Sequence, residues 1–299
     1  MRIGTRRSAL ALAQAEMVAE MLGGAELVPI VTGGDRGVAV GDKSRWVAEL
    51  EEALLEGRID IAVHSAKDLP GERAPGLDLL GAPARAGAED VLCGSDDLAG
   101  LPSGARVGTS SLRRLAQLRA ARADIEVVPL RGNVDTRLGR LAEGADGLTA
   151  IVLARAGLQR LGRTAEIGAV LDAARFVPAP GQGTLALEGR TEDQSCRAAI
   201  AAITDPTAFA CLLAERALAR ELGADCDTPL GAYALPEPGE GLLLRAWVGL
   251  PDGSAWAADE LSGELADPEG LGRTVASRLQ AVGAGELLER AREAAGDVD

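Results

Sequence analysis

The sequence predicts an α/β protein built from two lobes, followed by a smaller α+β domain. Short apolar runs alternate with segments of helical periodicity through the first two thirds of the 299 residues. This rhythm is typical of βαβ units around parallel or mixed sheets with helices on both faces. Two clusters of chain-breaking residues, at 82–88 and 177–183, mark the expected crossings between the lobes. A change of pattern after residue 203 sets the last domain apart.

The expected elements of the two lobes follow from these periodicities, in chain order. Short apolar runs predict strands at 2–5, 26–31, 60–63, 77–82, 106–108, 125–130, 149–154 and 185–188. Helical spacing of apolar residues predicts helices at 8–22, 44–56, 111–122, 134–143, 154–161, 164–171 and 195–202. In sheets of this kind, ligands bind at the strand ends, where loops lead into helices.

The last third of the chain predicts a separate unit. It begins with a long helix at 206–222 and continues with strands at 242–249 and 255–261, joined by a turn at 251–253. Amphipathic helices are expected across 268–294. We therefore assign residues 1–83 and 184–203 to the first lobe, 88–178 to the second lobe, and 206–299 to the C-terminal domain.

Composition and charge exclude several classes of function. The formal net charge of −14 argues against nucleic-acid binding and against an anionic membrane surface, both of which require a basic footprint. We expect no spanning helix because no run of about 18 apolar residues occurs, and no signal peptide because acidic residues interrupt the first 22 positions. The four cysteines lie far apart and only one histidine is present, so we expect no metal site and a reduced, cytoplasmic setting.

Against this acidic background, arginines gather at three predicted strand-to-helix junctions. The segments are Gly4-Thr5-Arg6-Arg7-Ser8, Gly108-Thr109-Ser110-Ser111-Leu112-Arg113-Arg114 and Arg131-Gly132-Asn133-Val134-Asp135-Thr136-Arg137. Helix N-termini attract anions, and the arginine side chain fits carboxylate or phosphate. Any single arginine would fit an exposed ion pair equally well. Their repeated placement instead favours a small polyanionic ligand.

A cluster of ionisable residues follows the predicted strand that ends near residue 63. It reads His64-Ser65-Ala66-Lys67-Asp68, which is compatible with acid–base chemistry. For this segment alone, the more economical interpretation is a solvated Lys67–Asp68 pair and a hydrogen-bonded core histidine. Near several arginines, Asp68 would remain ionised and could stabilise a developing cation.

Cys226 differs from the other three cysteines because it is expected on a loop. It lies between Asp225 and Asp227, just past a predicted helix, whereas Cys93, Cys196 and Cys211 lie in apolar or helical surroundings typical of core positions. The flanking acids argue against an activated thiolate nucleophile. A permanently alkylated sulfur would not need such activation.

Taken together, these segments resemble hydroxymethylbilane synthase, also called porphobilinogen deaminase. The markers occur in the family's order over about 230 residues. They are RIGTRRS at 2–8, DIAVHSAKDLP at 60–70, VGTSSLRR at 107–114, LRGNVDTRL at 130–138, AGLQRLG at 156–162, PGQG at 180–183, and Cys226 followed by PLGAYA at 229–234. Each is weak alone, but seven in order are specific.

The resemblance implies two periplasmic-binding-protein-like lobes and a third domain that carries the cofactor. It implies a transferase that joins four porphobilinogen molecules head to tail, releases ammonia and forms linear hydroxymethylbilane. Cys226 would hold a dipyrromethane cofactor through a thioether, and Asp68 would be the acid–base and electrostatic residue. The chain would act as a monomer.

The resemblance also assigns the remaining site residues. The residues expected to hold the cofactor are Ser65, Lys67, Thr109, Ser110, Ser111, Arg113, Arg114 and Arg131. The residues expected to bind substrate are Arg6, Ser8, Lys43, Arg137, Arg160 and Gln182. Because every pyrrole unit carries two carboxylates, a growing hexapyrrole accumulates about a dozen negative charges, which need fixed cationic partners.

The sequence departs from the family's pattern at two places. The loop after Thr32-Gly33-Gly34-Asp35 is shorter than usual, and we expect Lys43 to keep one basic contact, with Arg45 and Trp46 replacing the usual basic and aromatic residues. Asp225 stands before the cysteine where the family usually has glycine. Cofactor attachment should survive both changes.

Two other classes of function remain open from the residues alone. A non-catalytic, two-lobed binding protein for a small polycarboxylate would explain the arginines and the lobes, but not Cys226 or the third domain. A cysteine hydrolase would use Cys226 and His64, but the acidic flanks and the absence of an evident orienting residue disfavour it.

Overall fold

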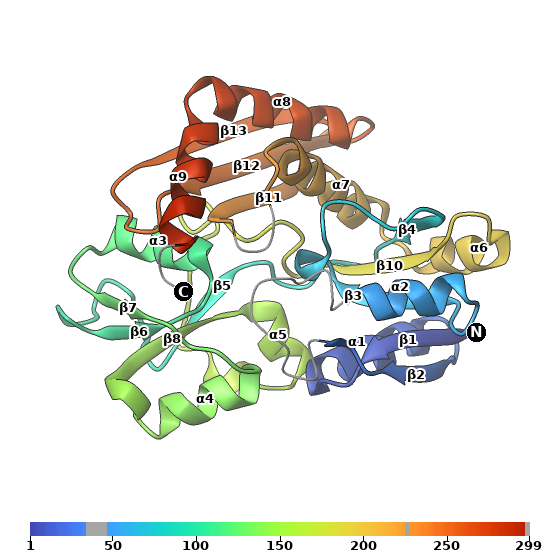
Figure 1. Ribbon diagram of the computed structural model, residues 1–299, viewed down its shortest axis with the longest axis horizontal. Coiled ribbons are helices and arrows are strands. Elements are labelled where there is room, and N and C mark those ends of the chain that lie inside the picture. Colours follow the sequence, from blue (N-terminus) through green and yellow to red (C-terminus); the bar gives the residue numbers. More distant parts are fainter. Residues whose placement is uncertain (34–46, 225–227, 297–299) are drawn as a thin grey trace.

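A computed structural model describes residues 1–33, 47–224 and 228–296. Two α/β lobes lie side by side, and the C-terminal domain lies against both of them (Figure 1). This confirms the predicted fold class of two α/β lobes with a smaller α+β domain. Two residues assigned from the resemblance, Lys43 and Cys226, lie outside the described residues, as do Arg45, Trp46 and Asp225.

The first lobe is a five-stranded mixed sheet in the order β2-β1-β3-β10-β4. Its strands are β1 (Arg2–Arg6), β2 (Glu26–Ile30), β3 (Ile61–Ser65), β4 (Leu77–Gly81) and β10 (Leu185–Arg190). Its helices are α1 (Ala9–Met21), α2 (Ala48–Leu55) and α6 (Gln194–Ile203), and a 3₁₀ turn, η3 (Ala66–Asp68), follows β3. Strand β1 runs parallel to β2 and β3, whereas β10 runs antiparallel to β3 and β4.

The second lobe repeats this arrangement in the order β7-β6-β8-β5-β9. Its strands are β5 (Asp90–Cys93), β6 (Arg106–Gly108), β7 (Glu126–Val128), β8 (Leu148–Ala154) and β9 (Ala169–Val170). Its helices are α3 (Leu112–Ala121), α4 (Val134–Ala142) and α5 (Arg155–Arg160), with 3₁₀ turns η4 (Ala145–Gly147) and η5 (Thr164–Glu166). Strand β6 is parallel to β7 and β8, and β5 is antiparallel to β8 and β9.

Each lobe thus contains one strand that runs antiparallel to the other four. In the first lobe this strand is β10, which the chain enters after it has built the second lobe. In the second lobe it is β5, which the chain enters directly from the first. Because both connections run between the sheets, the two lobes are joined by two chain crossings, as the breaker clusters predicted.

The C-terminal domain packs one face of an antiparallel sheet, in the order β11-β12-β13, against helices. Its elements are α7 (Pro206–Glu221), β11 (Leu230–Glu237), β12 (Gly241–Gly249), β13 (Trp256–Glu264), α8 (Pro268–Ala281) and α9 (Ala284–Gly296). Helices α7 and α8 each begin with proline after an aspartate cap, Asp205 and Asp267, which accept backbone N–H groups of the first turn. A core of alanine, leucine and valine lies between sheet and helices.

The three domains meet around one buried ion pair. Arg85, in the first crossing, donates from Nη1 to Glu215 Oε1 of α7 at 2.6 Å. The same carboxylate accepts the backbone N–H of Gly181, in the second crossing, and of Ala234, in β11, at 2.6 and 2.7 Å. The guanidinium lies 5.0 Å from the ring centroid of Tyr233. Both crossings are therefore attached to the C-terminal domain.

Most predicted elements are confirmed within one or two residues. The helix predicted at 44–56 includes residues 44–46, which lie outside the described residues, and α2 begins at Ala48. The strand predicted at 255–261 is longer and ends at Glu264.

The predicted helix at 164–171 is wrong: a short 3₁₀ turn is followed by strand β9. The backbone N–H groups of Gly168 and Leu171 bond to β5 at Leu92 and Asp90, so sheet pairing overrides the local helical pattern. Strands β5 and β11 were not predicted. Strand β5 is only four residues long and begins with an aspartate.

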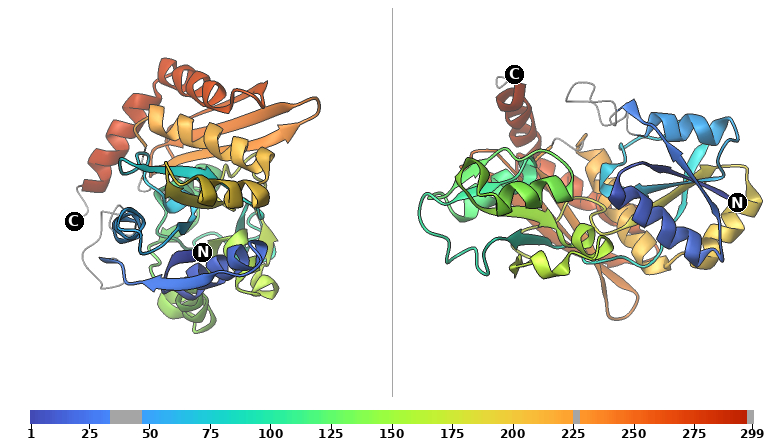
Figure 2. Two further views of the ribbon diagram at one scale, coloured as in Figure 1. Left: turned by 90° about the vertical axis from the view of Figure 1, so that its right-hand side faces the viewer. Right: turned by 90° about the horizontal axis from the view of Figure 1, so that it is seen from below.

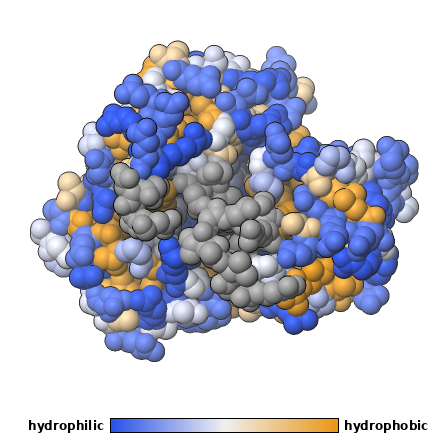
Figure 3. Space-filling view, viewed as in Figure 1, coloured by the Kyte–Doolittle hydropathy of each residue, from blue (hydrophilic) through white to orange (hydrophobic). Residues whose placement is uncertain are grey.

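Within the described ranges, no single helix is long and apolar enough to cross a membrane. In the same ranges, only α6 and α7 taken together have the necessary length and composition, and the chain bends by 108° between them. On the face shown in Figure 3, apolar patches alternate with hydrophilic side chains.

Candidate functional site

The first lobe places two predicted segments at one edge of its sheet. Strands β1 and β3 are parallel neighbours, so their carboxyl ends lie together. Arg6 ends β1, and Ser8 caps α1 by accepting the backbone N–H of Ala11 at 3.3 Å. Ser65 ends β3, and Lys67 and Asp68 follow in η3. The sheet topology therefore joins segments that are 60 residues apart in the sequence.

A small hollow of about 70 Å³ lies at this edge. Its lining combines predicted site residues with apolar ones: Arg6, Ser8, Leu10, Ala11, Gln14, Val47, Val63, His64, Ser65 and Asp68. One guanidinium, one carboxylate and several hydroxyl or amide groups thus face a common space. This is a suitable place for a small charged ligand.

Gln14 is a member of this site that the sequence interpretation missed. Its side chain is buried in α1, and Nε2 donates to Ser65 Oγ at 2.8 Å. The available signal was a glutamine beside Ala15 and Val18 on the apolar face of an otherwise alanine- and leucine-rich helix. A polar residue on a buried face needs a hydrogen-bond partner, and here Ser65 is that partner.

The second lobe brings its three predicted segments to the corresponding edge. Thr109 and Ser110 follow β6, and Ser111 caps α3 by accepting the backbone N–H of Arg114 at 3.4 Å. Arg131 follows β7, and α4 begins after it with Asn133 as cap. Arg160 ends α5, which follows β8. Because β6, β7 and β8 are mutually parallel, these junctions share one edge.

The two edges face each other. Helices α1 and α5 pack together across the boundary, with Leu10 beside Gly157 (Figures 1 and 2). The charge of Asp68, in the first lobe, acts on the guanidinium of Arg137, in the second. Lys67 Nζ donates to Gln182 Oε1 at 3.3 Å. Residues from both lobes and from the second crossing therefore surround Asp68.

Beneath this site, Asp90 holds the predicted ligands Arg113 and Arg114. Asp90 Oδ2 accepts from Arg113 Nη1 at 2.8 Å, and Oδ1 accepts from Arg114 Nε and Nη2 at 3.0 and 2.8 Å. Gln182 Nε2 donates to the same carboxylate at 2.8 Å. Burial alone would raise the pKa of Asp90, but the two guanidinium groups lower it overall. Asp90 was not predicted as part of the site.

Three cations among the predicted site residues are half-buried in a way that penalises their charge. Burial lowers the pKa of Lys67 to about 8, and the charge of Arg114 contributes to this. Burial likewise lowers the pKa of Arg160 to about 10, and burial with the nearby Arg114 lowers that of Arg137. The guanidinium groups of Arg137 and Arg160 donate to backbone carbonyls, of Gly132 and Gly183, rather than to carboxylates. An anionic ligand would relieve all three penalties.

The other predicted residues take different positions. Arg113 and Arg114 are buried, at 3% and 7% exposure, whereas Arg131 and Ser110 are exposed. His64 lies 2.9 Å from Glu188 in the core, so the interpretation as a hydrogen-bonded core histidine is confirmed.

The described cysteines have the positions that their surroundings predicted. Cys93, Cys196 and Cys211 are buried, and burial raises the pKa of each thiol. In the ranges that the structure describes, no group of three His, Cys, Asp or Glu side chains is arranged to hold a metal ion.

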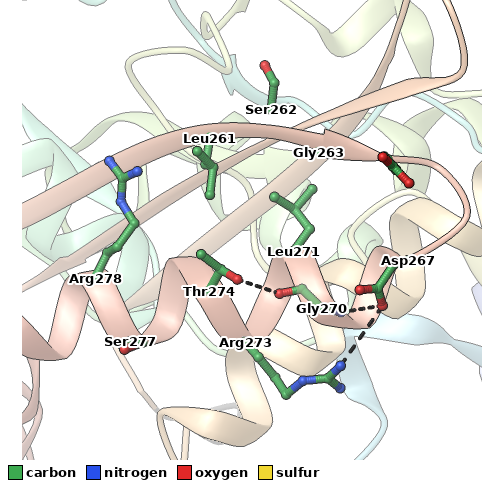
Figure 4. A pocket seen from close by; sticks show the side chains of 11 residues that line it. Leu261, Ser262, Gly263, Asp267, Gly270, Leu271, Arg273, Thr274, Ser277 and Arg278 are labelled. Atoms are coloured by element: carbon green, nitrogen blue, oxygen red, sulfur yellow. Dashed lines mark hydrogen bonds and ion pairs between the residues drawn. The ribbon is translucent and has the colours of Figure 1, made fainter.

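A wider hollow lies elsewhere, on the outer face of the C-terminal domain. It is an open groove of about 760 Å³ between β13 and α8 (Figure 4). Arg273 and Arg278 line it, but each pairs with an aspartate, Asp267 and Asp259. All of its lining residues belong to the C-terminal domain, so this groove is separate from the predicted site.

Comparison with known proteins matches nearly the whole chain. Residues 1–198 match a family model described as porphobilinogen deaminase, dipyromethane cofactor binding domain, and residues 209–281 match the C-terminal domain of the same family. A porphobilinogen deaminase from Roseiflexus sp. (strain RS-1) is 45% identical, with 96% of this chain and 97% of that protein covered. The chain belongs to the porphobilinogen deaminase family.

Further porphobilinogen deaminases show the same degree of similarity. The protein from Xanthomonas euvesicatoria pv. vesicatoria (strain 85-10) is 46% identical, with 96% of this chain and 98% of that protein covered. That from Thiobacillus denitrificans (strain ATCC 25259 / T1) is 43% identical, at 96% and 97%. The match to the cofactor-binding domain spans both lobes, so the family's dipyrromethane cofactor belongs to the region built above.

Among solved structures, similarity is much weaker. A periplasmic substrate-binding protein of an ABC transporter from Coxiella burnetii aligns with 70% of this chain and 93% of its own, at a TM-score of 0.42 and 13% identity. The methionine-binding protein MetQ aligns at a TM-score of 0.40 and 15% identity, with 68% of this chain and 89% of its own covered. The fold assignment rests on the sheet topology of this chain and not on these alignments.

Proposed function

We propose that this porphobilinogen deaminase acts as a hydroxymethylbilane synthase on a cysteine-linked dipyrromethane primer. It joins four porphobilinogen molecules head to tail, each addition releases one ammonia, and water releases the linear tetrapyrrole. The product serves tetrapyrrole biosynthesis. When bound, the dipyrromethane supplies the terminal pyrrole carbon to which the first substrate is joined, and Cys226 would hold it through a thioether.

The observation that carries this proposal is a set of half-buried cations where the two lobes and the second crossing meet. Lys67 and Arg160 donate to neighbouring residues of the crossing, Gln182 and Gly183, and Arg137 feels the charge of Asp68; burial lowers the pKa of all three cations. Carboxylates placed there would replace the lost hydration of these cations with charge-assisted hydrogen bonds. A dipyrromethane carries carboxylates on both rings, so these residues fit the group.

In this proposal, Asp68 is the residue that touches the reacting atoms. Its carboxyl group would give a proton to the departing amine, and the carboxylate so formed would stabilise the cation left on the substrate. After the new bond forms, the carboxylate would accept the proton that the attacked pyrrole carbon loses. This proton restores the carboxyl group for the next addition.

The other residues bind and orient. Arg6, Ser8, Arg137, Arg160, Gln182 and Lys43 would hold the substrate and the growing chain, and Ser65, Lys67, Thr109, Ser110, Ser111, Arg113, Arg114 and Arg131 would hold the cofactor. For Arg113 and Arg114, carboxylates of the cofactor would share guanidinium groups that already pair with Asp90. Each arginine presents several N–H donors, so one guanidinium can serve both partners.

In the same proposal, the first lobe comprises residues 1–83 and 184–203, the second lobe 88–178, and the C-terminal domain 206–299. The chain acts as a monomer in the cytoplasm on porphobilinogen. Its net charge of −14 disfavours nucleic acid and membrane surfaces as partners.

Replacing Asp68 with asparagine tests the proposed chemistry. Asp68→Asn keeps the size of the side chain but removes its proton-transfer capacity and its charge, so turnover of porphobilinogen should fall by roughly 100- to 10,000-fold. Binding of substrate to the cofactor-loaded protein should persist, as measured by calorimetry.

Asp78→Asn is the matched control, because Asp78 pairs with Arg73 at the surface of the same lobe. It should retain turnover. Unchanged turnover in Asp68→Asn would remove Asp68 from the proposed role. Binding without any turnover in the wild-type protein would favour a polycarboxylate-binding protein instead.

A further inference from the structure

A buried imidazole–carboxylate pair lies just before the site, and the proposed chemistry does not use it. His64 Nε2 is 2.9 Å from Glu188 Oε2, with His64 6% exposed and Glu188 fully buried. A buried carboxylate requires a hydrogen-bond donor, because it has lost its water. His64 Nε2 is the donor that the described contacts give Glu188, so we infer that this nitrogen carries a proton.

A second carboxylate, that of Glu51, lies close enough to interact with this pair. Glu51, in α2, lies on the same side of the sheet, and burial followed by the negative charge of Glu188 raises the pKa of Glu51. The charge of His64 acts in the opposite direction. His64, Glu188 and Glu51 thus form one electrostatic cluster behind the site.

The side chains of His64 and Ser65, which both border the hollow of the site, lie on opposite faces of β3. Successive side chains of a strand point to opposite faces. Ala62 packs with Leu50 of α2, whereas Val63 packs with Val18 of α1. By the same alternation, His64 lies on the α2 face.

Ser65, the next residue, lies on the α1 face, where it bonds to Gln14 at 2.8 Å. The last two residues of β3, His64 and Ser65, are therefore each held by a side-chain hydrogen bond, on opposite faces. A strand end fixed on both faces cannot rotate without breaking one of these bonds.

The pair also bridges the point at which the sheet changes register. In the antiparallel pairing of β3 with β10, His64 is opposite Ala186 and Ala62 is opposite Glu188, so the side-chain bond runs diagonally. The pairing of β10 with β4 shifts between Leu187 and Glu188. A directional hydrogen bond at this position favours one register over its neighbours, which an apolar contact would not.

The short stretch of chain between His64 and Asp68 is closely held. Ala66 is 2% exposed, and its N–H donates to Thr184 O at 3.0 Å. Asp68 lies only two residues further on, within the same 3₁₀ turn. A displacement of His64 is therefore transmitted to Asp68 along a tightly held chain.

We propose that His64 and Glu188 are a positioning pair, which holds the end of β3 and thereby sets the place of Asp68. The inference rests on the proposed role of Asp68 and adds the residues on which its placement depends. Stability alone does not account for the pair, because an apolar pair of similar volume is often equally or more stable than a buried ionic one. A displacement of about 1 Å can cost on the order of 100-fold in rate.

A double substitution separates positioning from stability. In His64→Leu/Glu188→Leu, both polar groups are absent, so the melting temperature of the cofactor-loaded protein should equal or exceed that of wild type. The kcat should still fall about tenfold or more, with KM within about twofold, because the strand end has lost its directional bond. His64→Gln, which can still donate to Glu188, should recover part of this loss. A double variant with wild-type kcat would overturn the proposal.

Ile200→Ala supplies the matched control for general damage to the lobe. Ile200 is fully buried in α6 and packs in the core on the α1 face of the sheet. It should lower the melting temperature while leaving kcat close to the wild-type value. A loss of kcat equal to that of the double variant would mean that turnover follows lobe stability, which contradicts a positioning role.

The single histidine allows a direct spectroscopic test that does not depend on turnover. In a ¹⁵N-labelled wild-type chain, imidazole NMR should show a protonated Nε2 whose proton exchanges slowly, and Glu188→Leu should make this exchange fast. An unprotonated Nε2 in the wild type would overturn the pair itself. If the protected proton is present but Asp68→Asn retains turnover, the proposed catalytic role fails and the pair does not.

Discussion

Asp90 fixes the positions of Arg113 and Arg114, the two arginines in the first turn of α3. Its carboxylate accepts from Arg113 and Arg114, and both arginines also donate to backbone carbonyls, of Val177 and Val152. These contacts attach α3 to β8 and to the second chain crossing. Asp90 is thus a structural anion beneath a site proposed for anionic ligands.

Removing the charge of Asp90 should be costly. Asp90→Asn leaves two buried guanidinium groups without a carboxylate, and we expect a loss of about 3–5 kcal/mol in the free energy of unfolding, measured with urea. Because the folded-state pKa of Asp90 is lowered, its contribution is present above the ordinary pKa and is lost as the pH falls further.

Asp124→Asn provides the comparison for Asp90, since Asp124 pairs with Arg122 at the surface of the same lobe. Because this ion pair is exposed to solvent, its loss should change the free energy of unfolding far less than that of Asp90. Equal losses in the two variants would show that the buried cluster contributes no more than an exposed pair.

Lys67 predicts a dependence of stability on pH in the protein without cofactor. Burial lowers the pKa of Lys67 from 10.5 to about 8. Between these values the unfolded chain binds more protons than the folded one, so stability should rise with pH. The chain has only two lysines, Lys43 and Lys67, so Lys67→Met should remove most of this rise. Thermal unfolding across pH 8–10 measures the effect, and a rise of equal size in Lys67→Met would contradict it.

At the residue scale, the sequence predicted the positions of site residues better than it predicted the distant residues to which they bond. The positions of Arg6, Ser8, Lys67 and Asp68 at strand ends follow from local pattern and are found there. Gln14, Asp90 and Glu188 were not identified, because each acts through a residue more than 20 positions away. Such pairings depend on sheet order, which local periodicity does not encode.

At the scale of elements, η3 and the second crossing are in close contact at Gly181. Gly181 has φ +75°, and a Cβ added there would lie 2.9 Å from the carbonyl carbon and the Cβ of Ala66 and 3.1 Å from Lys67 N. Only glycine allows the crossing to approach the turn this closely. The position of η3 thus depends on a loop from a different part of the chain.

Gly181→Ala should therefore affect both stability and turnover. The added methyl group must displace Ala66 or the crossing, so we expect kcat to fall at least tenfold, beyond the strain of a positive φ. Gly57→Ala has a similar φ of +69° and no atom within 4 Å of the added Cβ, so it isolates the backbone strain. It should cost about 1 kcal/mol in unfolding experiments without loss of kcat. Equal kinetic effects would rule out the steric account.

Elements were easier to predict where the chain is locally regular. Helices α1, α3, α4 and α7 carry clear cap residues, and their bounds follow from the sequence. Strand β9 was predicted as a helix and strand β5 was not predicted, because both are short and depend on pairing with other strands of the sheet. Prolines and glycines identified both crossings, and β10, which follows the second crossing, was predicted, whereas β5, which follows the first, was not.

At the scale of the whole molecule, Glu215 links the two crossings to the C-terminal domain. It is fully buried, and it accepts from Arg85, Gly181 and Ala234. These partners belong to the first crossing, the second crossing and β11. Movement of the lobes relative to each other must therefore take place around an anchored point.

Loss of the Glu215 charge should loosen this anchor. Glu215→Gln leaves Arg85 buried without its carboxylate, and we expect a loss of about 3 kcal/mol and a broader or split transition in differential scanning calorimetry. Glu221→Gln changes an exposed residue of the same helix and should leave the transition unchanged. A single, unshifted transition in Glu215→Gln would show that the domains are joined by other contacts.

The molecule as a whole is an acidic protein that holds half-buried cations where its two lobes meet the second crossing. Burial lowers the pKa of Lys67, Arg137 and Arg160, which is costly unless an anionic ligand binds there. In the proposed function, this ligand includes a dipyrromethane covalently attached to the chain.

The intact mass of the purified protein tests this claim most directly. Protein from cells that make porphobilinogen should be heavier than its sequence by two porphobilinogen units less two ammonia, and Cys226→Ser should lack the added mass. A wild-type protein with the mass of its sequence alone would contradict the account.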